Sequence, residues 1–254
     1  MDQNCSYITN PGYPSSYTPT STPMTISYTI NKSSSDICRI RLDFDQFVLS
    51  APVTTGVDAT PGVIGGPDVA TDTAIDGQCQ NDIMTITTTA LSTVPVTGAT
   101  GSIGNYPYFC GSNTGYHSYI DLSCDSTDSA ALNFQIGDGN NNQWKIKVTQ
   151  LSCNSDDVAS TEGCFQYYTG LTGVVESYNF AGNNNHLAAT NYKACIRPEA
   201  GYCCISWSVE EAFKVDLAGE ETANLATNVC RGDGKQGTKG KIRILREAYQ
   251  TKKQ

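Results

Sequence analysis

Two short patterns of residues capable of chemistry occur twice in this chain, in the same order. In one pattern a Phe follows a Cys by nine positions, and in the other an Asp follows a Cys by three. Cysteines can form disulfides, and a carboxylate can bind a cation or accept backbone hydrogen bonds. The repeated order indicates two diverged copies of one cysteine-stapled module. The first copy is Cys38–Phe47 with Cys79–Asp82, and the second is Cys204–Phe213 with Cys230–Asp233.

Catalytic patterns are sparse. The chain has only two histidines, His117 and His186, and no Gly-x-Ser-x-Gly elbow that would hold a serine nucleophile. A thiol–imidazole pair of Cys110 and His117 is conceivable, but Cys110 is better explained as half of a disulfide, and His117 as a packed strand residue. The sequence therefore predicts a protein that is not an enzyme.

The composition predicts a secreted, extracellular protein. Eleven cysteines in 254 residues are typical of an oxidising compartment, and the sequons at Asn4 and Asn31 predict N-glycosylation. No window approaches the ~18 apolar residues of a membrane span. The formal charge of −9 argues against nucleic acid as a partner. Half of the basic residues gather near the C-terminus, which is typical of a protected edge strand or of a dock for an acidic surface.

Alternating apolar residues predict β-strands along the whole chain. Arg39 to Asp45 alternates charged and apolar side chains, as a half-buried strand does, and no segment sustains a helical period. The fold class predicted is all-β, with two antiparallel sandwich modules at 1–157 and 158–254, the second shortened. Long polar loops are expected at 51–78 and 92–105. Further strands are expected at 24–30, 83–88, 119–122, 131–136, 144–148, 192–196, 204–207 and 241–245.

Several of these phrases together resemble the CUB domain family, and more narrowly the secreted tandem CUB proteins of arthropods. The likeness covers most of residues 5–215 and implies a disulfide-stapled jelly-roll sandwich. The sequence departs from the family in having no cysteine near Thr25–Ser27, and no Cys-Gly after Cys230. The phrases are Cys5, Asn10-Pro-Gly-Tyr-Pro14, Leu42-Asp-Phe44, Cys79-x-x-Asp82, Phe109-Cys-Gly111, Trp144-Lys-Ile-Lys-Val148, Gly163-Cys-Phe-Gln-Tyr-Tyr168 and Tyr192-Lys-Ala-Cys-Ile196.

The resemblance implies the disulfide Cys79–Cys110. Cys38–Cys153 would join the strand at 38–47 to the last strand of the first module, which leaves Cys5–Cys124, with Cys5–Cys38 as a rival pairing. In the second module we expect Cys164–Cys195. Cys203, Cys204 and Cys230 would then share one bridge and one odd thiol, which is either free or intermolecular.

The resemblance also implies a possible calcium site. In the first module Asp82 would bind the ion with Asp138 and Asn140 or Asn141, while Ser50 stands where many CUB domains have a Glu. The alternative is that Asp138 and Asn140 only build a turn, and that Asp82 accepts backbone hydrogen bonds. In the second module the corresponding residues are Asp216 and Asp233.

These observations predict a secreted, non-enzymatic protein that acts in binding, adhesion or extracellular assembly. Its partner would be an extracellular protein, a glycan or another copy of the chain. Two alternatives stay open: a regulatory fragment of a larger secreted protein such as a protease, and a self-assembling fibre or matrix protein that exchanges its basic C-terminal strand.

Overall fold

The structure is a computed structural model, and every element in its described residues is a β-strand, paired antiparallel wherever its register is given. This confirms the all-β prediction. The described residues are 5–52, 77–89, 106–122, 127–137, 141–155, 163–180, 187–188 and 190–206, with four further pieces at 102–103, 216–217, 220–221 and 249–252.

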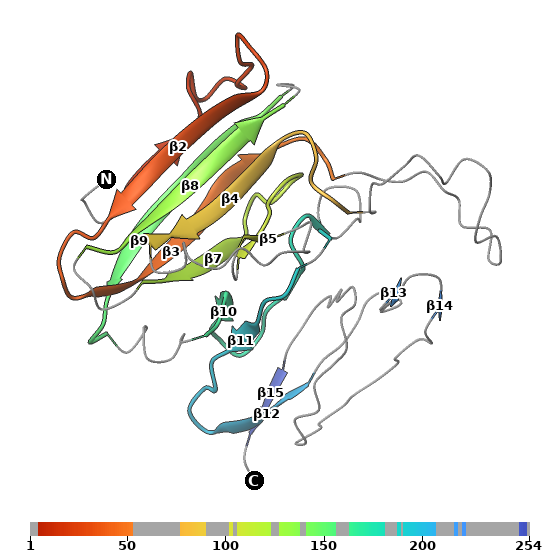
Figure 1. The fold of residues 1–254 in the computed structure, drawn as a ribbon. Helices are drawn as coiled ribbons and strands as arrows, with labels where there is room; N and C mark the ends of the chain where they lie inside the picture. The colour runs from red at the N-terminus through yellow and green to blue at the C-terminus, as the bar shows by residue number, and fades with distance from the viewer. Residues whose placement is uncertain are drawn as a thin grey trace. The chain divides into compact units, whose positions relative to one another are not determined.

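Two sheets form the main body (Figure 1). The four-stranded sheet has the order β1-β9-β3-β7, from Ser6–Thr9, Gln143–Ser152, Ile37–Val48 and His117–Asp121. The three-stranded sheet has the order β2-β8-β4, from Met24–Asn31, Ser129–Ile136 and Ile83–Thr88. A bridge between Met84 and Phe109 extends this second sheet beyond β4.

Apolar side chains from alternate positions fill the space between the sheets. In β3 the buried residues Ile40, Leu42 and Phe44 face inward, and the register shifts after Phe44, so that Phe47 is again buried. Phe134 of β8 stacks on Trp144 of β9 with ring centroids 4.2 Å apart. Burial of such large side chains, at roughly 25 cal/mol per Å² of apolar surface, is the main force that stabilises the sandwich.

Disulfides Cys38–Cys153 and Cys79–Cys110 are present, the two pairs expected above for the first module. Because Cys38 is bonded to Cys153, the rival pairing Cys5–Cys38 is excluded. Cys124 lies outside the described residues, so Cys5–Cys124 stays a prediction.

Cys164 and Cys195, expected to pair with each other, are both disulfide-bonded. The other three cysteines of the second module are not described in enough detail to assign. The side chains of Cys203 and Cys204 are not described, and Cys230 lies outside the described residues, so their pairing stays open.

Contacts divide the chain into two compact units. The unit that holds the sandwich continues past residue 157, the expected module boundary, as far as Gln166, and it also includes Tyr178–Lys193. Phe165, Tyr178 and Leu187 belong to its hydrophobic core. This part of the chain therefore packs as a component of the first sandwich.

The second unit contains Gly56–Thr73, Tyr167–Ser177 and Ala194–Gln254, described only in pieces. β10 (Gln166–Tyr168) pairs with β11 (Ala194–Ile196), and β12 (Tyr202–Ser206) pairs antiparallel with β15 (Tyr249–Lys252). The expected strand at 241–245 lies outside the described residues. Two short antiparallel strand pairs remain among the described residues. β5 (Ser102–Ile103) pairs with β6 (Tyr106–Pro107), and β13 (Asp216–Leu217) pairs with β14 (Glu220–Glu221).

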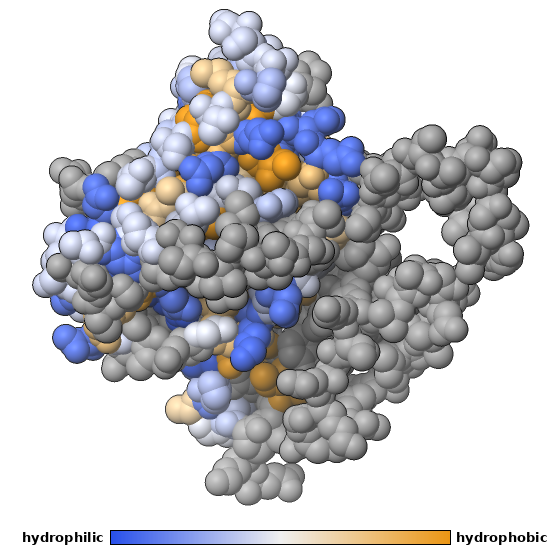
Figure 2. Space-filling view, viewed as in Figure 1, coloured by the Kyte–Doolittle hydropathy of each residue, from blue (hydrophilic) through white to orange (hydrophobic). Residues whose placement is uncertain are grey.

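Figure 2 shows the described residues on one side of the molecule as mainly hydrophilic, with hydrophobic groups interspersed. This is the usual surface of a β-sandwich whose inward positions are apolar.

Candidate binding surface

The outer face of the four-stranded sheet carries an ordered array of charged and aromatic side chains. One register row crosses all four strands as Tyr7, Lys147, Asp43 and His117. Because side chains alternate along a strand, this row points away from the core residues on either side of it. The next row includes Arg41 opposite Tyr119. We name the outward side chains of these strands the outer-face array: Tyr7, Arg39, Arg41, Asp43, Asp45, His117, Tyr119, Lys145 and Lys147.

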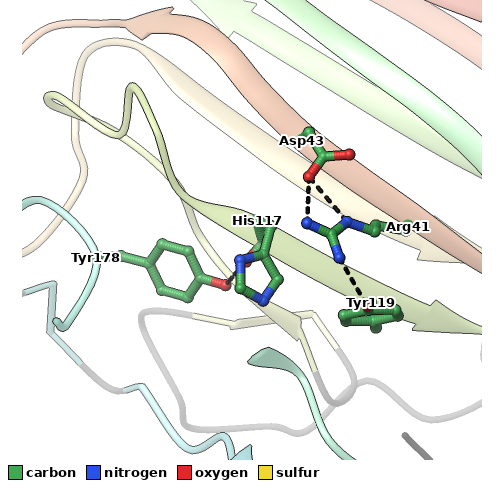
Figure 3. Close-up of polar contacts among 5 residues, drawn as sticks. All are labelled: Arg41, Asp43, His117, Tyr119 and Tyr178. Carbon is green, nitrogen blue, oxygen red and sulfur yellow. Dashed lines mark hydrogen bonds and ion pairs between the residues drawn. The ribbon is translucent and has the colours of Figure 1, made fainter. Parts of the chain in front are cut away.

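Arg41 is the best-connected member of the array. Its Nε donates to Asp43 Oδ1 at 2.8 Å, its Nη2 lies 2.7 Å from the same oxygen, and its Nη1 donates to the Tyr119 hydroxyl at 2.9 Å (Figure 3). Burial alone would lower the pKa of Arg41, but the bond to Asp43 and nearby charge leave this pKa raised. The guanidinium is therefore held in one orientation at the surface, with 36% of the side chain exposed.

A second arginine lies beside the first. Arg39 is 1% exposed, and its Nε donates to Asp121 Oδ1 at 2.5 Å. The guanidinium carbons of Arg39 and Arg41 lie 5.6 and 5.5 Å from the Tyr119 ring centroid, within cation–π range. Tyr119 itself is buried, so at this end its hydroxyl serves to position Arg41.

The other end of the array is open to solvent. Lys145 Nζ lies 3.3 Å from Asp45 Oδ2 and 4.7 Å from the Tyr7 ring centroid. The bond to Asp45 raises the pKa of Lys145, to which Tyr7 and Tyr13 also contribute. Tyr7 and Tyr13 are the most exposed aromatic residues described, at 47% and 37%. Tyrosines presented in this way are common at protein interfaces.

His117 is held in β7 by packing and backbone contacts. Its backbone carbonyl accepts a hydrogen bond from the Tyr178 hydroxyl at 2.8 Å, and its ring contacts the Tyr119 ring edge-on (Figure 3). The Tyr178 hydroxyl also bonds with Ser118 Oγ at 2.6 Å. Cys110 is bonded to Cys79, so it is not available as a thiol partner for His117. His186 lies outside the described residues.

The edge of β7 is closed by a distant part of the chain. Tyr119 N–H donates to the Phe165 carbonyl at 2.9 Å, next to the Tyr178 contacts. Asn179 continues this closure: its Oδ1 accepts from Ser112 N–H at 2.9 Å, and its own N–H donates to Asn113 Oδ1 at 2.8 Å. Backbone groups at the sheet edge are thereby paired within the chain.

Of the residues expected at the calcium site in the first module, the structure describes Ser50, Asp82 and the exposed Asn141, and Asp82 is the one carboxylate among them. Asp82 is 1% exposed, its Oδ1 accepts from Gly137 N–H at 2.7 Å, and its Oδ2 accepts from Ser50 Oγ at 2.5 Å. These bonds fit a structural role in the loop, whereas calcium takes six to eight oxygen ligands, more than these residues supply. Asp138 and Asn140 lie outside the described residues, as does Asp233, and the side chain of Asp216 is not described. Calcium therefore stays a prediction.

Of the two sequons, Asn31 is exposed at the end of β2, and Asn4 lies outside the described residues. Sequence pattern predicts three of the four strands that carry the outer-face array, β3, β7 and β9, but neither β1 nor the array itself. Alternation reports which side chains share a face of one strand, but the register that brings Arg41 opposite Tyr119 depends on pairing between distant strands.

Fold and site together define a disulfide-stapled antiparallel β-sandwich with a polar, aromatic outer face. Residues 161–250 match the family model described as animal CUB domain, which confirms the CUB relationship for this part of the chain. CUB domains are extracellular, non-catalytic protein-binding modules. The narrower resemblance to tandem CUB proteins of arthropods stays a prediction.

A solved structure, the CUB1-EGF-CUB2 domain of human MASP-1/3, is similar at 14% identity and a TM-score of 0.35. The alignment covers 98% of this chain and 92% of that one. No curated protein sequence matches the chain. Within the described residues, no helix has the length and apolar character needed to cross a bilayer.

Proposed function

We propose that the protein is a secreted, non-enzymatic binding protein that acts in adhesion or in the assembly of an extracellular structure. The outer-face array is the observation that carries this proposal. It presents exposed tyrosines beside oriented charged groups, all carried by the hydrogen-bonded four-stranded sheet. Rigid aromatic and charged side chains contribute most of the binding energy at many protein interfaces.

Two further features support an extracellular binding role. The CUB match at 161–250 assigns part of the chain to a family of protein-binding modules. The disulfides Cys38–Cys153 and Cys79–Cys110 are typical of proteins that fold in an oxidising compartment.

A solid-phase binding assay tests the proposal. The chain, expressed through a secretory pathway, is applied to decellularised matrix and to a panel of purified extracellular proteins. We expect saturable binding to at least one surface, and its loss after the disulfides are reduced. Failure to bind any of them saturably, or hydrolysis of the offered proteins, would contradict the proposal.

A further inference from the structure

Basic side chains of the first module are concentrated on one face. Residues 1–157 contain fifteen acidic residues and only five basic ones. Four of these five belong to β3 and β9, and all four point to the outer face of the four-stranded sheet; the fifth is Lys32, which follows β2. The four are Arg39, Arg41, Lys145 and Lys147.

The outer face of the other sheet is different. Its central polar contacts join uncharged groups: Ser27 Oγ bonds with Asn133 Oδ1 at 2.6 Å, and Asn133 Nδ2 donates to Thr87 Oγ1 at 3.2 Å. The outward residues of β2 are likewise uncharged, among them Thr25 and Thr29. The basic residues of the first module are therefore gathered in the array, among Asp43, Asp45 and Asp121, and are not scattered evenly over its surface.

The spacing of the two lysines suits an extended ligand. Lys145 and Lys147 are two residues apart on β9, so their side chains leave the same face about 6.6 Å apart. Carboxylates at alternate residues of an extended peptide repeat at the same ~6.6 Å interval. Tyr7 lies opposite Lys147 and contacts Lys145, which adds an exposed aromatic surface beside both charges.

We propose that Tyr7, Tyr13, Arg41, Lys145 and Lys147 form a docking patch for an acidic protein segment, extended, with carboxylates at alternate residues. This inference rests on the proposed binding function and names the partner class for the same surface. The array carries four cations beside Asp43, Asp45 and Asp121, so it is more positive than the rest of an acidic module, and its lysines can steer and hold carboxylates. Asp43 holds Arg41 in place and Asp45 holds Lys145 in place.

Fluorescence anisotropy of a labelled alternating Glu-Thr peptide, added to the full chain at low and high salt, tests the patch. The variant Lys145→Gln/Lys147→Gln is compared with Lys32→Gln/Lys193→Gln, which removes the same charge from positions outside the array. Both variants keep the basic residues near the C-terminus, so a difference between them reports the patch alone. We expect the first variant to bind about two- to fivefold more weakly per lysine, and the second to bind nearly as the parent does.

Equal losses in the two variants would overturn the inference, because they would show an effect of net charge only. Two other results would also overturn the inference. In one, Lys145→Gln/Lys147→Gln weakens the binding of a heparin oligosaccharide but not of the peptide. In the other, sedimentation shows that this variant converts a dimer of the chain to a monomer. If the variant still binds matrix or extracellular proteins as the parent does, the proposed function stands and only the patch is refuted.

Discussion

Asn179 provides a quantitative test of the closure at the β7 edge. It is 1% exposed and has a φ of 62°, in the left-handed region that Asn tolerates better than Ala. Its side chain accepts from Ser112 N–H, and its backbone N–H is bound by Asn113. The change Asn179→Ala removes the acceptor and places an unsuitable residue at a positive φ.

Two costs add in this variant. Leaving a partly buried N–H without its acceptor costs about 1–3 kcal/mol, and an alanine in the left-handed region costs about 1 kcal/mol more than asparagine does. We therefore expect Asn179→Ala to lower the free energy of unfolding by about 2–4 kcal/mol. Asn179→Gly loses the same hydrogen bond without the backbone penalty, so it should be less destabilising by about 1 kcal/mol.

Urea unfolding, followed by circular dichroism and tryptophan fluorescence, measures both variants. Asn154→Ala, at an exposed asparagine, is the matched control and should stay within about 0.5 kcal/mol of the parent. If Asn179→Ala behaved like this control, the assignment of Tyr178–Lys193 to the sandwich would be wrong. If glycine cost as much as alanine, the strain argument would fail.

Three other predictions follow from buried or exposed single residues. Burial raises the pKa of Tyr192 to about 12, from 10.0, so the stability that this neutral phenol contributes is complete below pH 10 and is lost between pH 10 and 12. Unfolding measured across this range should show a loss of about 2 kcal/mol that Tyr192→Phe removes; an unchanged alkaline slope would refute it. Asp82→Ala should destabilise the chain by about 2 kcal/mol in a chelating buffer, because Gly137 N–H and the Ser50 hydroxyl lose a charged acceptor. Stability lost only when calcium is present would instead assign Asp82 to a metal site, and a calorimetric calcium titration distinguishes the two. Asn31 should carry a glycan in a secretory host, seen as a mass shift on enzymatic deglycosylation that Asn31→Gln abolishes.

Much of the sandwich could be predicted from local sequence pattern. Alternation located the strand at 83–88 with its observed bounds and placed the ends of the strand at 24–30 within one residue. Such patterns predict strands because each strand of a two-layer sandwich has one buried face, which requires an apolar side chain at every second residue.

The closure by Phe165, Tyr178 and Asn179 could not be predicted in the same way. These residues follow the last strand of the sandwich, and their partners on β7 and at Ser112 lie about 50–70 positions earlier in the chain. Periodicity shows that a residue is buried, but not which segment buries it. The module boundary expected at residue 157 therefore rests on the short polar stretch at 153–163 and on the second copy that opens at Cys164, without these contacts.

Peptide mapping of the native chain under non-reducing conditions tests the central claim most directly. The account of a covalently stapled sandwich that presents a rigid binding face predicts peptides linked through Cys38–Cys153 and Cys79–Cys110. Recovery of Cys79 or Cys38 as a thiol, or linked to a different cysteine, would contradict it.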